Sequence, residues 1–175
     1  LVAKSDDDAG CEGATIIETV MDWQQFTSSP RTGHWLLQPL IDGDPLSLSA
    51  IFSGGTARLL TVNRQLIQRC DDSFVLEGCL VNAITDTRSR FSDLTDLVAA
   101  AIPELWGYAG IDLLDTPHGL RVLEINPRLT SSYAGISTAK GINPAQCVIN
   151  LATGGGLPEP WTHTGQAIDI RWKAD

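Results

Sequence analysis

Apolar and polar positions alternate with a period of two over much of the chain, which predicts a protein built mainly from β-strands. Turn signals separate the strand-like runs: D-G-D-P and S-G-G-T divide the stretch 34–67 into three segments. Other runs are LVAK and ATIIE near the start, and FVLEGCLVNAI, GYAGIDLLD, GLRVLEIN and QAIDIRW later in the chain. Because strands joined by turns this short pair antiparallel, we expect an antiparallel sheet.

Two longer stretches have the apolar spacing of helices. SDLTDLVAAAIPEL is predicted to begin with Ser92 as its N-cap, and INPAQCVINLATGGG with Asn143 as N-cap and Pro144 at the first helical position. A short helix is expected near 22–26. The hydroxyl run 130–132 predicts the start of another helix, whose amides and hydroxyls could face a substrate anion. Strands and helices together predict an α+β fold with an antiparallel sheet as its core.

Composition narrows the class of protein. With 175 residues, 43% of them hydrophobic, the chain can bury one core, as a single domain or as a domain with a small lobe. The net charge of -9 argues against a general nucleic-acid binder, which needs a basic surface to replace counterions. The apolar runs are shorter than the roughly 20 residues that cross a bilayer, and the chain does not open with a signal segment. A cytoplasmic protein without nucleic-acid or membrane partners is predicted, and a homo-oligomer is left open.

The cysteines and histidines do not form a metal motif. Four cysteines stand far apart without a C-x-x-C pair, which predicts buried free thiols rather than a zinc knuckle or a redox dithiol. The three histidines are equally scattered, so a histidine metal site is not expected.

The stretch GIDLLDTPHGLRVLEIN predicts a hairpin whose register follows from its side chains. Placing Asp112 opposite Glu124 also pairs apolar with apolar residues and one acid with one base. The further pairs predicted in this register are Ile111 with Ile125, Leu113 with Leu123, Leu114 with Val122 and Asp115 with Arg121. A slip by one residue would turn every side chain to the other face.

This register places Asp112, Glu124 and Asn126 on one face of the hairpin. Directly opposed strand residues have Cβ atoms about 5 Å apart, where two like charges destabilise unless they are compensated. Two carboxylates with an amide oxygen suit Mg²⁺ or Mn²⁺, and Mg²⁺ held by so few groups completes its shell with water and nucleotide phosphates. The pattern therefore points to a phosphoryl-transfer site. The alternative, an exposed Asp112 with Glu124 paired to an arginine, stays open at this point.

A second candidate site lies at the start of the chain. Lys4 ends an apolar strand, and the loop after it closes with A-G-C-E-G, whose amides could cover phosphates while Lys4 neutralises their charge. The same loop holds Asp6, Asp7 and Asp8, a poor lining for a phosphate pocket and a common composition for an acidic surface turn. This signal is weak by itself.

The order of these motifs resembles the ATP-grasp family of carboxylate–amine ligases. A strand ending in A-K, a glycine-containing loop, a strand ending in QPLIDG, and then GIDLL and VLEINPR follow one another. The resemblance runs from Lys4 to about Ser132, and its most specific part is GID followed by E-x-N-P-R. Within the family the chain is similar to the tyramine:glutamate ligase-like proteins of methanofuran-type cofactor biosynthesis.

The resemblance implies a partial ATP-grasp fold and a division into lobes. Residues 1–37 would form part of the small lobe with the phosphate flap, 38–44 the hinge, and 45–175 the large lobe with the metal site. An upstream substrate-binding domain and an earlier lysine would precede Leu1.

The resemblance also implies a role for each matching residue. Lys4 would bind a nucleotide phosphate, and Gly10 and Gly13 would bracket the flap. The hinge would present its main chain to the adenine through Gln38, Pro39, Leu40 and Ile41. Asp44, or Asp42 beside it, would hold the ribose. One or two Mg²⁺ or Mn²⁺ ions would be bound by Asp112, Glu124 and Asn126. Arg128 would be the catalytic residue, which steadies the transferring phosphoryl group or the acyl phosphate.

The implied activity is the ATP-dependent joining of a small carboxylic acid to an amine through an acyl phosphate. Two features depart from the family pattern: Lys4-Ser5 stands where Lys-Pro is frequent, and the loop carries three aspartates. They leave open a non-catalytic nucleotide-binding or structural remnant. A carboxylate-pair hydrolase with Asp112 and Glu124 as acid and base is a more distant alternative, in which Asn126 and Arg128 would have no role.

Overall fold

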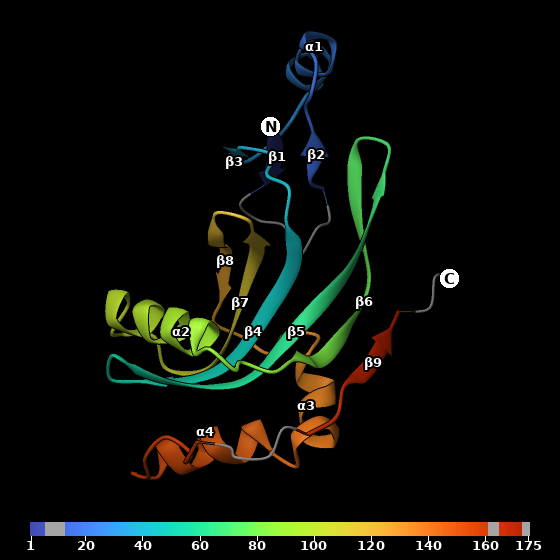
Figure 1. The fold of residues 1–175 in the computed structure, drawn as a ribbon. Helices are drawn as coiled ribbons and strands as arrows, with labels where there is room; N and C mark the ends of the chain where they lie inside the picture. Colours follow the sequence, from blue (N-terminus) through green and yellow to red (C-terminus); the bar gives the residue numbers. More distant parts are fainter. Residues whose placement is uncertain (6–12, 161–164, 173–175) are drawn as a thin grey trace. The chain divides into compact units, whose positions relative to one another are not determined.

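The structure, a computed structural model, describes residues 1–5, 13–160 and 165–172. The chain folds as two compact units, each described by itself below (Figure 1). The N-terminal unit consists of Leu1–Asp42 and Leu66–Glu77, and the C-terminal unit of Gly43–Gln65 and Gly78–Asp175. No helix in these described ranges is long and apolar enough to cross a membrane.

An antiparallel sheet organises the C-terminal unit, in the order β9-β6-β5-β4-β7-β8. Its strands are β4 (Asp44–Ser53), β5 (Thr56–Cys70), β6 (Ser73–Ile84), β7 (Gly107–Thr116), β8 (Gly119–Asn126) and β9 (Ile168–Arg171). The distal ends of β5 and β6 belong to the N-terminal unit. The predicted α+β class with an antiparallel sheet is confirmed.

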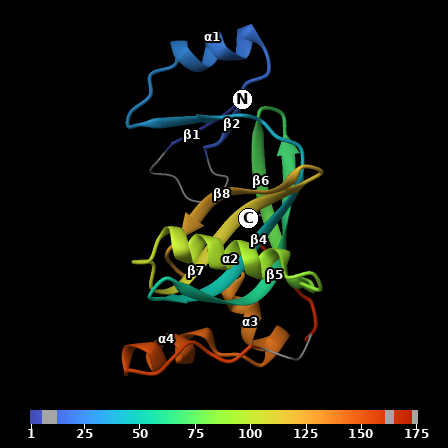
Figure 2. The ribbon, with the colours of Figure 1, turned by 60° about the vertical axis from the view of Figure 1, so that its left-hand side comes forward.

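Strand β4 is buried along most of its length because both of its faces are covered. Alternate residues, among them Leu46, Leu48 and Phe52, pack in the core that includes Phe91 and Val98 of α2 (Arg90–Ala101), and Figure 2 shows this helix lying across the sheet. The β4 side chains on this face are apolar from Leu46 to Phe52.

The opposite face of the same sheet changes character along its length. Ile51 of β4 packs in a second core with Tyr108 and with Ile136 of α3 (Tyr133–Lys140). Ser47 and Ser49, which share this face with Ile51, are also buried. The sheet therefore offers an apolar surface to α3 and a polar surface farther along β4 and β7, where Asp112 lies.

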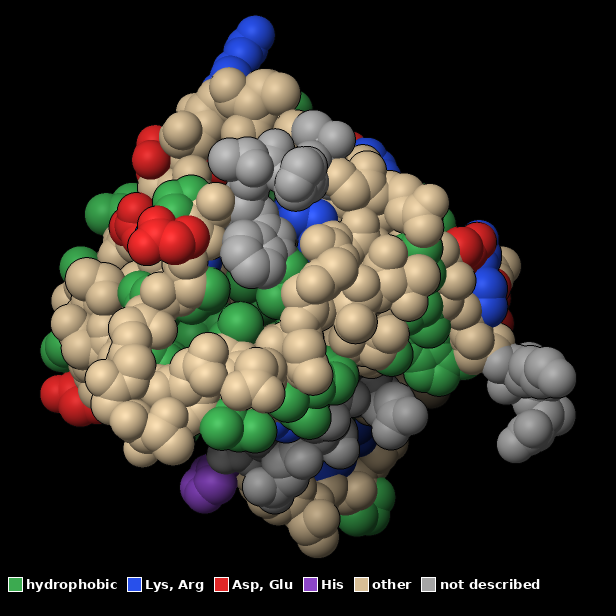
Figure 3. Space-filling view, turned by 90° about the horizontal axis from the view of Figure 1, so that it is seen from below, with side chains coloured by type: hydrophobic (Ala, Val, Ile, Leu, Met, Phe, Trp, Pro, Cys, Tyr) green, Lys and Arg blue, Asp and Glu red, His purple; other side chains and the backbone are tan. Residues whose placement is uncertain are grey.

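Helix α4 (Pro144–Ala152) begins as predicted. Asn143 is its N-cap, and its side chain accepts a hydrogen bond from the Gln146 amide, with Pro144 in the first turn. Ile149 on this helix is exposed. In the view from below, apolar side chains gather in the middle of the surface, and acidic side chains lie toward its left and right sides (Figure 3).

The N-terminal unit holds the short strands β1 (Val2–Ser5), β2 (Thr15–Ile16) and β3 (Trp35–Gln38), ordered β3-β1-β2-β6. Helix α1 (Val20–Ser28) starts at a capping box between Thr19 and Asp22. The small core of the N-terminal unit consists of Ala3, Ile17 and Phe26, and Trp35 packs against it.

The cap of α2 differs from the prediction. Ser92 is not the N-cap, because the helix begins two residues earlier at Arg90 and the capping carboxylate comes from outside it. Oδ2 of Asp86 accepts hydrogen bonds from the amides of Phe91 and Ser92 (3.2 and 2.8 Å) and from the Ser92 hydroxyl (3.0 Å). The prediction chose Ser92 because it is the serine nearest the apolar run. In the folded protein the loop before α2 brings Asp86 to the N-terminus of the helix, which carries a partial positive charge.

We expect Asp86→Ala to lower the free energy of unfolding by about 1 kcal/mol, since it leaves the first amides of α2 without their acceptor. Urea denaturation would measure the change. Asp96→Ala, at an exposed position of the same helix, is the matched control and should change stability by less than about 0.5 kcal/mol. Equal effects of the two substitutions would contradict the capping role.

The described cysteines are free thiols, as predicted, but only one of them is buried. Cys79 is buried, and desolvation, followed by the negative charge of Asp169, raises the pKa of its thiol to about 11. Cys70 and Cys147 are partly exposed. Cys11 lies outside the described residues.

Candidate functional site

The hairpin of β7 and β8 has the predicted register where the acids lie. Asp112 stands opposite Glu124, Ile111 opposite Ile125, and Gly110 opposite Asn126. Because residues two apart on a strand share a face, Asp112, Glu124 and Asn126 lie on the same face of the sheet, as predicted.

Beyond Asp112 the predicted pairs are wrong. A β-bulge shifts the register, so Leu113 faces Val122, Leu114 faces Arg121 and Asp115 faces Leu120. Leu123 is the extra residue of the bulge, which is why the predicted pair of Leu113 with Leu123 does not form. A register inferred from side-chain pairs assumes an uninterrupted ladder, which the bulge breaks.

Asp115 has a partner from another element instead of the predicted Arg121. Arg90, the first residue of α2, donates two hydrogen bonds to the Asp115 carboxylate, at 2.7 and 3.1 Å. The fork of the guanidinium matches the two carboxylate oxygens, so the contact is bidentate. This ion pair joins α2 to β7.

The carboxylate of Asp112 is held by two neutral amides. Asn126 Nδ2 donates to Asp112 Oδ2 at 3.1 Å, and Gln65 Nε2 from β5 donates to Asp112 Oδ1 at 2.9 Å. Arg128 Nη2 in turn donates to Asn126 Oδ1 at 3.0 Å. The structure thus joins Asp112, Asn126 and Arg128 in one chain of contacts, with Glu124 directly across the hairpin. Gln65 was missed as a site residue, because nothing in its own strand marks it.

Burial and like charge dominate the electrostatics at Asp112. Desolvation, and next the negative charge of Glu124, raise the pKa of Asp112 to about 6. The charge of Arg128 and the hydrogen bonds from Asn126 and Gln65 act in the opposite direction without cancelling the rise. An ionised Asp112 is therefore costly in this position unless a further positive charge is present.

This donor set fits a hard divalent cation. It consists of two carboxylates and an amide, and the described ranges contain no cluster of three or more His, Cys, Asp or Glu side chains suited to a metal ion. Carboxylate and amide oxygens without thiol or imidazole suit Mg²⁺ or Mn²⁺ rather than zinc. A divalent ion would also compensate the repulsion that raises the pKa of Asp112.

A network of hydroxyl groups fixes the segment that follows β8. The Tyr108 hydroxyl bonds Ser49 and Thr130, and Ser132 bonds both Ser49 and Thr130, each at 3.0 Å. Ser132 is buried at the start of α3. The hydroxyls of Thr130 and Ser132 thus bond other side chains of the protein, and binding of an anion by this run stays a prediction.

The glycine of the GID motif has a steric reason. A Cβ placed on Gly110 would lie 2.5 Å from Cγ2 of Thr130, closer than such atoms approach in proteins. Thr130 therefore packs directly against the backbone of β7 at Gly110, which lies two residues before Asp112.

We expect Gly110→Ala to lower the free energy of unfolding by about 1 kcal/mol, because Thr130 must move and its bond to Tyr108 is disturbed. Thermal unfolding would measure the loss. Gly156→Ala is the matched control, since a Cβ there meets nothing within 4 Å. If the control cost as much as Gly110→Ala, the close approach of Thr130 would not explain the motif glycine.

The predicted nucleotide residues lie mostly in the N-terminal unit. Lys4 on β1 pairs with Leu36, and Gln38, the last residue of β3, pairs with Val2. Pro39, Leu40 and Ile41 follow β3 directly. Gly13 is exposed with a φ of 73°, and Gly10 lies outside the described residues.

Asp44 opens β4 in the C-terminal unit and forms an ion pair with Arg64 (3.4 Å). Both side chains are well exposed, so this pair contributes little to stability.

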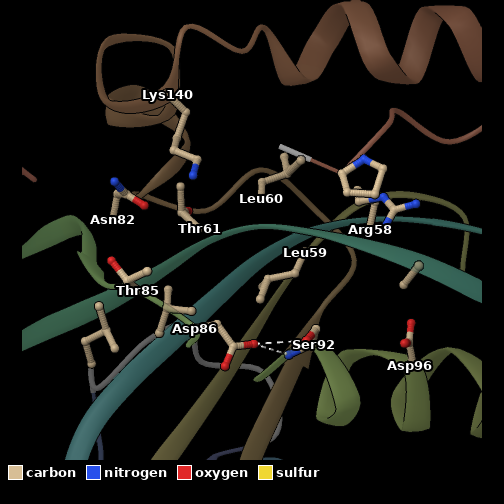
Figure 4. Close-up of a pocket in the computed structure, with 14 residues that line it drawn as sticks. Arg58, Leu59, Leu60, Thr61, Asn82, Thr85, Asp86, Ser92, Asp96 and Lys140 are labelled. Carbon is tan, nitrogen blue, oxygen red and sulfur yellow. Dashed lines mark hydrogen bonds between the residues drawn. The ribbon is translucent and has the colours of Figure 1, made fainter. Parts of the chain in front are cut away.

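A pocket of about 390 Å³ also lies in the C-terminal unit, away from the predicted site residues. Figure 4 shows Lys140 and Thr61 on one side of β5, and Asp86 with Ser92 on the other. Its polar groups point to opposite sides of a strand and do not converge on one position. The pair of Asp112 and Glu124 remains the candidate site.

Comparison with known proteins agrees with the motif order and the hairpin geometry. A family model described as the ATP-grasp domain matches residues 1–132, three quarters of the chain. The chain belongs to the ATP-grasp family. This ATP-grasp chain is also 33% identical, over 105 residues, to the tyramine–L-glutamate ligase of Methanocaldococcus jannaschii. The matched stretch covers 60% of the chain and 32% of that ligase, so the chain spans about a third of the length of its curated relative.

Solved structures confirm the ATP-grasp fold. The N5-carboxyaminoimidazole synthetase of Staphylococcus aureus, complexed with ADP, has a TM-score of 0.71 at 16% identity over 91% of the chain and 42% of its own. The biotin carboxylase domain of the Hydrogenobacter thermophilus 2-oxoglutarate carboxylase, in complex with MgADP, ADP and bicarbonate, has a TM-score of 0.70 at 17% identity, over 91% of the chain and 37% of its own. At these identities the likeness concerns the fold alone.

Proposed function

We propose that this chain is part of an ATP- and Mg²⁺-dependent ligase that joins a carboxylic acid to an amine. The observation that carries the proposal is the pair of Asp112 and Glu124 opposed across the hairpin, with Asn126 and Arg128 attached to it. Family membership supports the use of ATP. The name of the M. jannaschii relative, a tyramine–L-glutamate ligase, supports an amine and an amino-acid carboxylate as the classes of substrate.

Asp112, Glu124 and Asn126 would hold the magnesium ion or ions, which supply positive charge to the phosphates when bound. The residues of the chain position the reactants and neutralise their negative charge. Arg128 is steered by its bond to Asn126, which presents the guanidinium beside the acid pair, where it would stabilise charge on the transferring phosphoryl group.

The overall reaction would proceed in two steps. A carboxylate oxygen of the acid attacks the γ-phosphorus of ATP, the bond to ADP breaks, and an acyl phosphate forms. The amine nitrogen then attacks the acyl carbon, loses a proton and displaces phosphate, which leaves an amide. Positioning the reactants in line is the main contribution of the protein.

The remaining assignments belong to the same proposal. Lys4 and the 10–13 flap would contact phosphates, the main chain of 38–41 the adenine, and Asp44 the ribose. The last assignment requires Asp44 to leave its ion pair with Arg64, which is cheap because both groups are exposed. Lobes divided at a hinge over 38–44, an upstream substrate-binding domain and a cytoplasmic location complete the proposal.

Isothermal titration separates this function from a structural remnant that binds no nucleotide. Mg²⁺ with a non-hydrolysable ATP analogue should bind the chain with a micromolar dissociation constant, and the binding should weaken strongly when EDTA removes the metal. Absence of binding heat would favour a structural remnant. Binding that is equally tight in EDTA would point to a nucleotide module without the proposed metal site.

A further inference from the structure

We propose that Gln65 is a positioning residue of the metal site: it orients the Asp112 carboxylate for a divalent cation without neutralising it. The proposal rests on the metal site of the proposed function and adds a residue to it. Its basis is the hydrogen bond from Gln65 Nε2 to Asp112 Oδ1, at 2.9 Å.

The contact spans two strand spacings. β4 lies between β5 and β7, and neighbouring strands are about 4.8 Å apart, so the backbones of Gln65 and Asp112 are separated by at least about 10 Å. The β4 residue beside Asp112 is Ser47, which pairs on its other side with Asn63, so Gln65, two residues beyond Asn63, reaches Asp112 diagonally across β4. Because Ser47 is small, a side chain as long as glutamine can pass over it and reach the acid.

The short polar side chains beneath this contact satisfy one another. The Asn63 amide donates to the hydroxyls of Ser47 (3.3 Å) and Ser49 (3.2 Å), and its Oδ1 accepts from the Asn82 amide (3.0 Å). Asn63 is completely buried, two residues before Gln65 on the same face of β5. Asn63 and the two serines are hydrogen-bonded without Gln65, whose amide extends instead to Asp112.

Two amides hold Asp112 from different strands. Gln65 bonds Oδ1 from β5, and Asn126 bonds Oδ2 from β8, so both oxygens of the carboxylate are fixed. Each carboxylate oxygen has a second lone pair, which is still available to a cation. A ligand that is already oriented loses less conformational entropy when the metal binds, the usual effect of a bond to a metal ligand.

The neutrality of glutamine distinguishes this arrangement from an ordinary structural contact. A lysine or arginine at position 65 would also reach Asp112, but its charge would compensate the acid pair and compete with the cation. A neutral amide orients the carboxylate without adding a positive charge that would compete with the metal for Asp112. The burial of Asp112 makes that difference large, since charges interact more strongly away from water.

Binding of Mn²⁺ to the 175-residue chain tests the proposal. Free Mn²⁺ is followed by electron paramagnetic resonance in the presence of a non-hydrolysable ATP analogue, for the unmodified chain, Gln65→Met and Gln65→Asn. We expect both variants to bind Mn²⁺ about tenfold more weakly, the typical effect of removing a bond to a metal ligand. Met keeps the length but cannot donate, whereas Asn can donate but is too short to reach Asp112. Gln65→Lys should weaken binding at least as much.

Gln146→Met is the matched control, because Gln146 is exposed on α4 and bonds Asn150 of the same helix. It should bind Mn²⁺ like the unmodified chain. Circular dichroism and thermal unfolding select the Gln65 variants that are folded, and the two substitutions differ enough for one to serve if the other does not fold. Unchanged Mn²⁺ affinity in a folded Gln65 variant would overturn the role of Gln65 alone. No Mn²⁺ binding by the unmodified chain would overturn the metal site and this role with it.

Discussion

Asp112→Asn and Glu124→Gln are each expected to abolish metal-dependent ATP turnover in the complete ligase while leaving the fold intact. Each substitution replaces a negatively charged carboxylate ligand by a neutral amide of the same size. The cation then loses a negatively charged ligand, while the packing of the side chain is kept. We expect Mn²⁺ affinity of the chain to fall by more than about 100-fold, beyond the loss typical of indirect partners of a metal. Phosphate release and Mn²⁺ binding would measure the two effects.

Asp115→Asn is the matched control. It removes an acid from the same strand as Asp112, but this acid already forms an ion pair with Arg90. It should leave turnover and Mn²⁺ binding unchanged and cost at most about 1 kcal/mol of stability. Substantial ATP turnover in Asp112→Asn or Glu124→Gln would remove the basis for the proposed metal site. Loss of turnover in all three variants would indicate a general effect of charge rather than a site.

Asp112→Asn is also expected to stabilise the metal-free chain at neutral pH. The folded chain binds the Asp112 proton more tightly than the unfolded chain, because the pKa rises from an ordinary value of 3.8 to about 6. Asp112 therefore supports the fold while it is protonated, below about pH 4, and that support is lost as the pH rises through about 6. A shift of about two units corresponds to about 3 kcal/mol. The new amide nitrogen cannot accept the hydrogen bond from Gln65 or Asn126, which costs about 1 kcal/mol. Allowing for this loss and for the partial exposure of the group, we expect a gain of about 1 kcal/mol for the variant at pH 7.5.

Urea unfolding in EDTA at pH 4 and pH 7.5 would measure this gain. The variant and the unmodified chain should be about equally stable at pH 4 and differ at pH 7.5, and Mg²⁺ should stabilise only the unmodified chain at pH 7.5. Asp115→Asn should show no gain at either pH, because Arg90 already compensates that acid. A variant less stable than the unmodified chain at pH 7.5 would contradict the electrostatic cost assigned to Asp112.

These two predictions describe one property of the site. Asp112 faces Glu124 on a partly buried hairpin, where we expect its charge to lower the stability of the metal-free protein. The same repulsion favours a divalent cation, which is the usual exchange of stability for function at a site of concentrated charge. The neutral amides of Gln65 and Asn126 fit this view, because they orient Asp112 without removing the need for the cation.

Local patterns predicted the elements and some of their details well. Alternation identified the strands, and Asn143 with Pro144 marked the start of α4. The opposition of Asp112 and Glu124 also followed from pairing alone. Each of these features depends on residues close in sequence or directly across one hairpin, where side-chain type and backbone geometry are tightly linked.

Other features depend on contacts that no local pattern records. Leu123 enters a bulge, Asp86 rather than Ser92 caps α2, and Arg90 rather than Arg121 pairs with Asp115. In each case an alternative partner in the sequence is equally plausible by residue type. The choice between them is made by how the loop before α2 and the hairpin pack against the rest of the sheet.

By itself, then, the sequence determined the strands and helices, the opposed acids and the order of motifs that marks the ATP-grasp family. The tertiary structure alone decided which groups surround those acids. Gln65 lies 47 residues before Asp112 and two strands away from it. The small side chain of Ser47, on the intervening strand β4, leaves room for their hydrogen bond. Such a contact depends on the order of strands in the sheet, because that order, rather than distance along the chain, sets which side chains can meet.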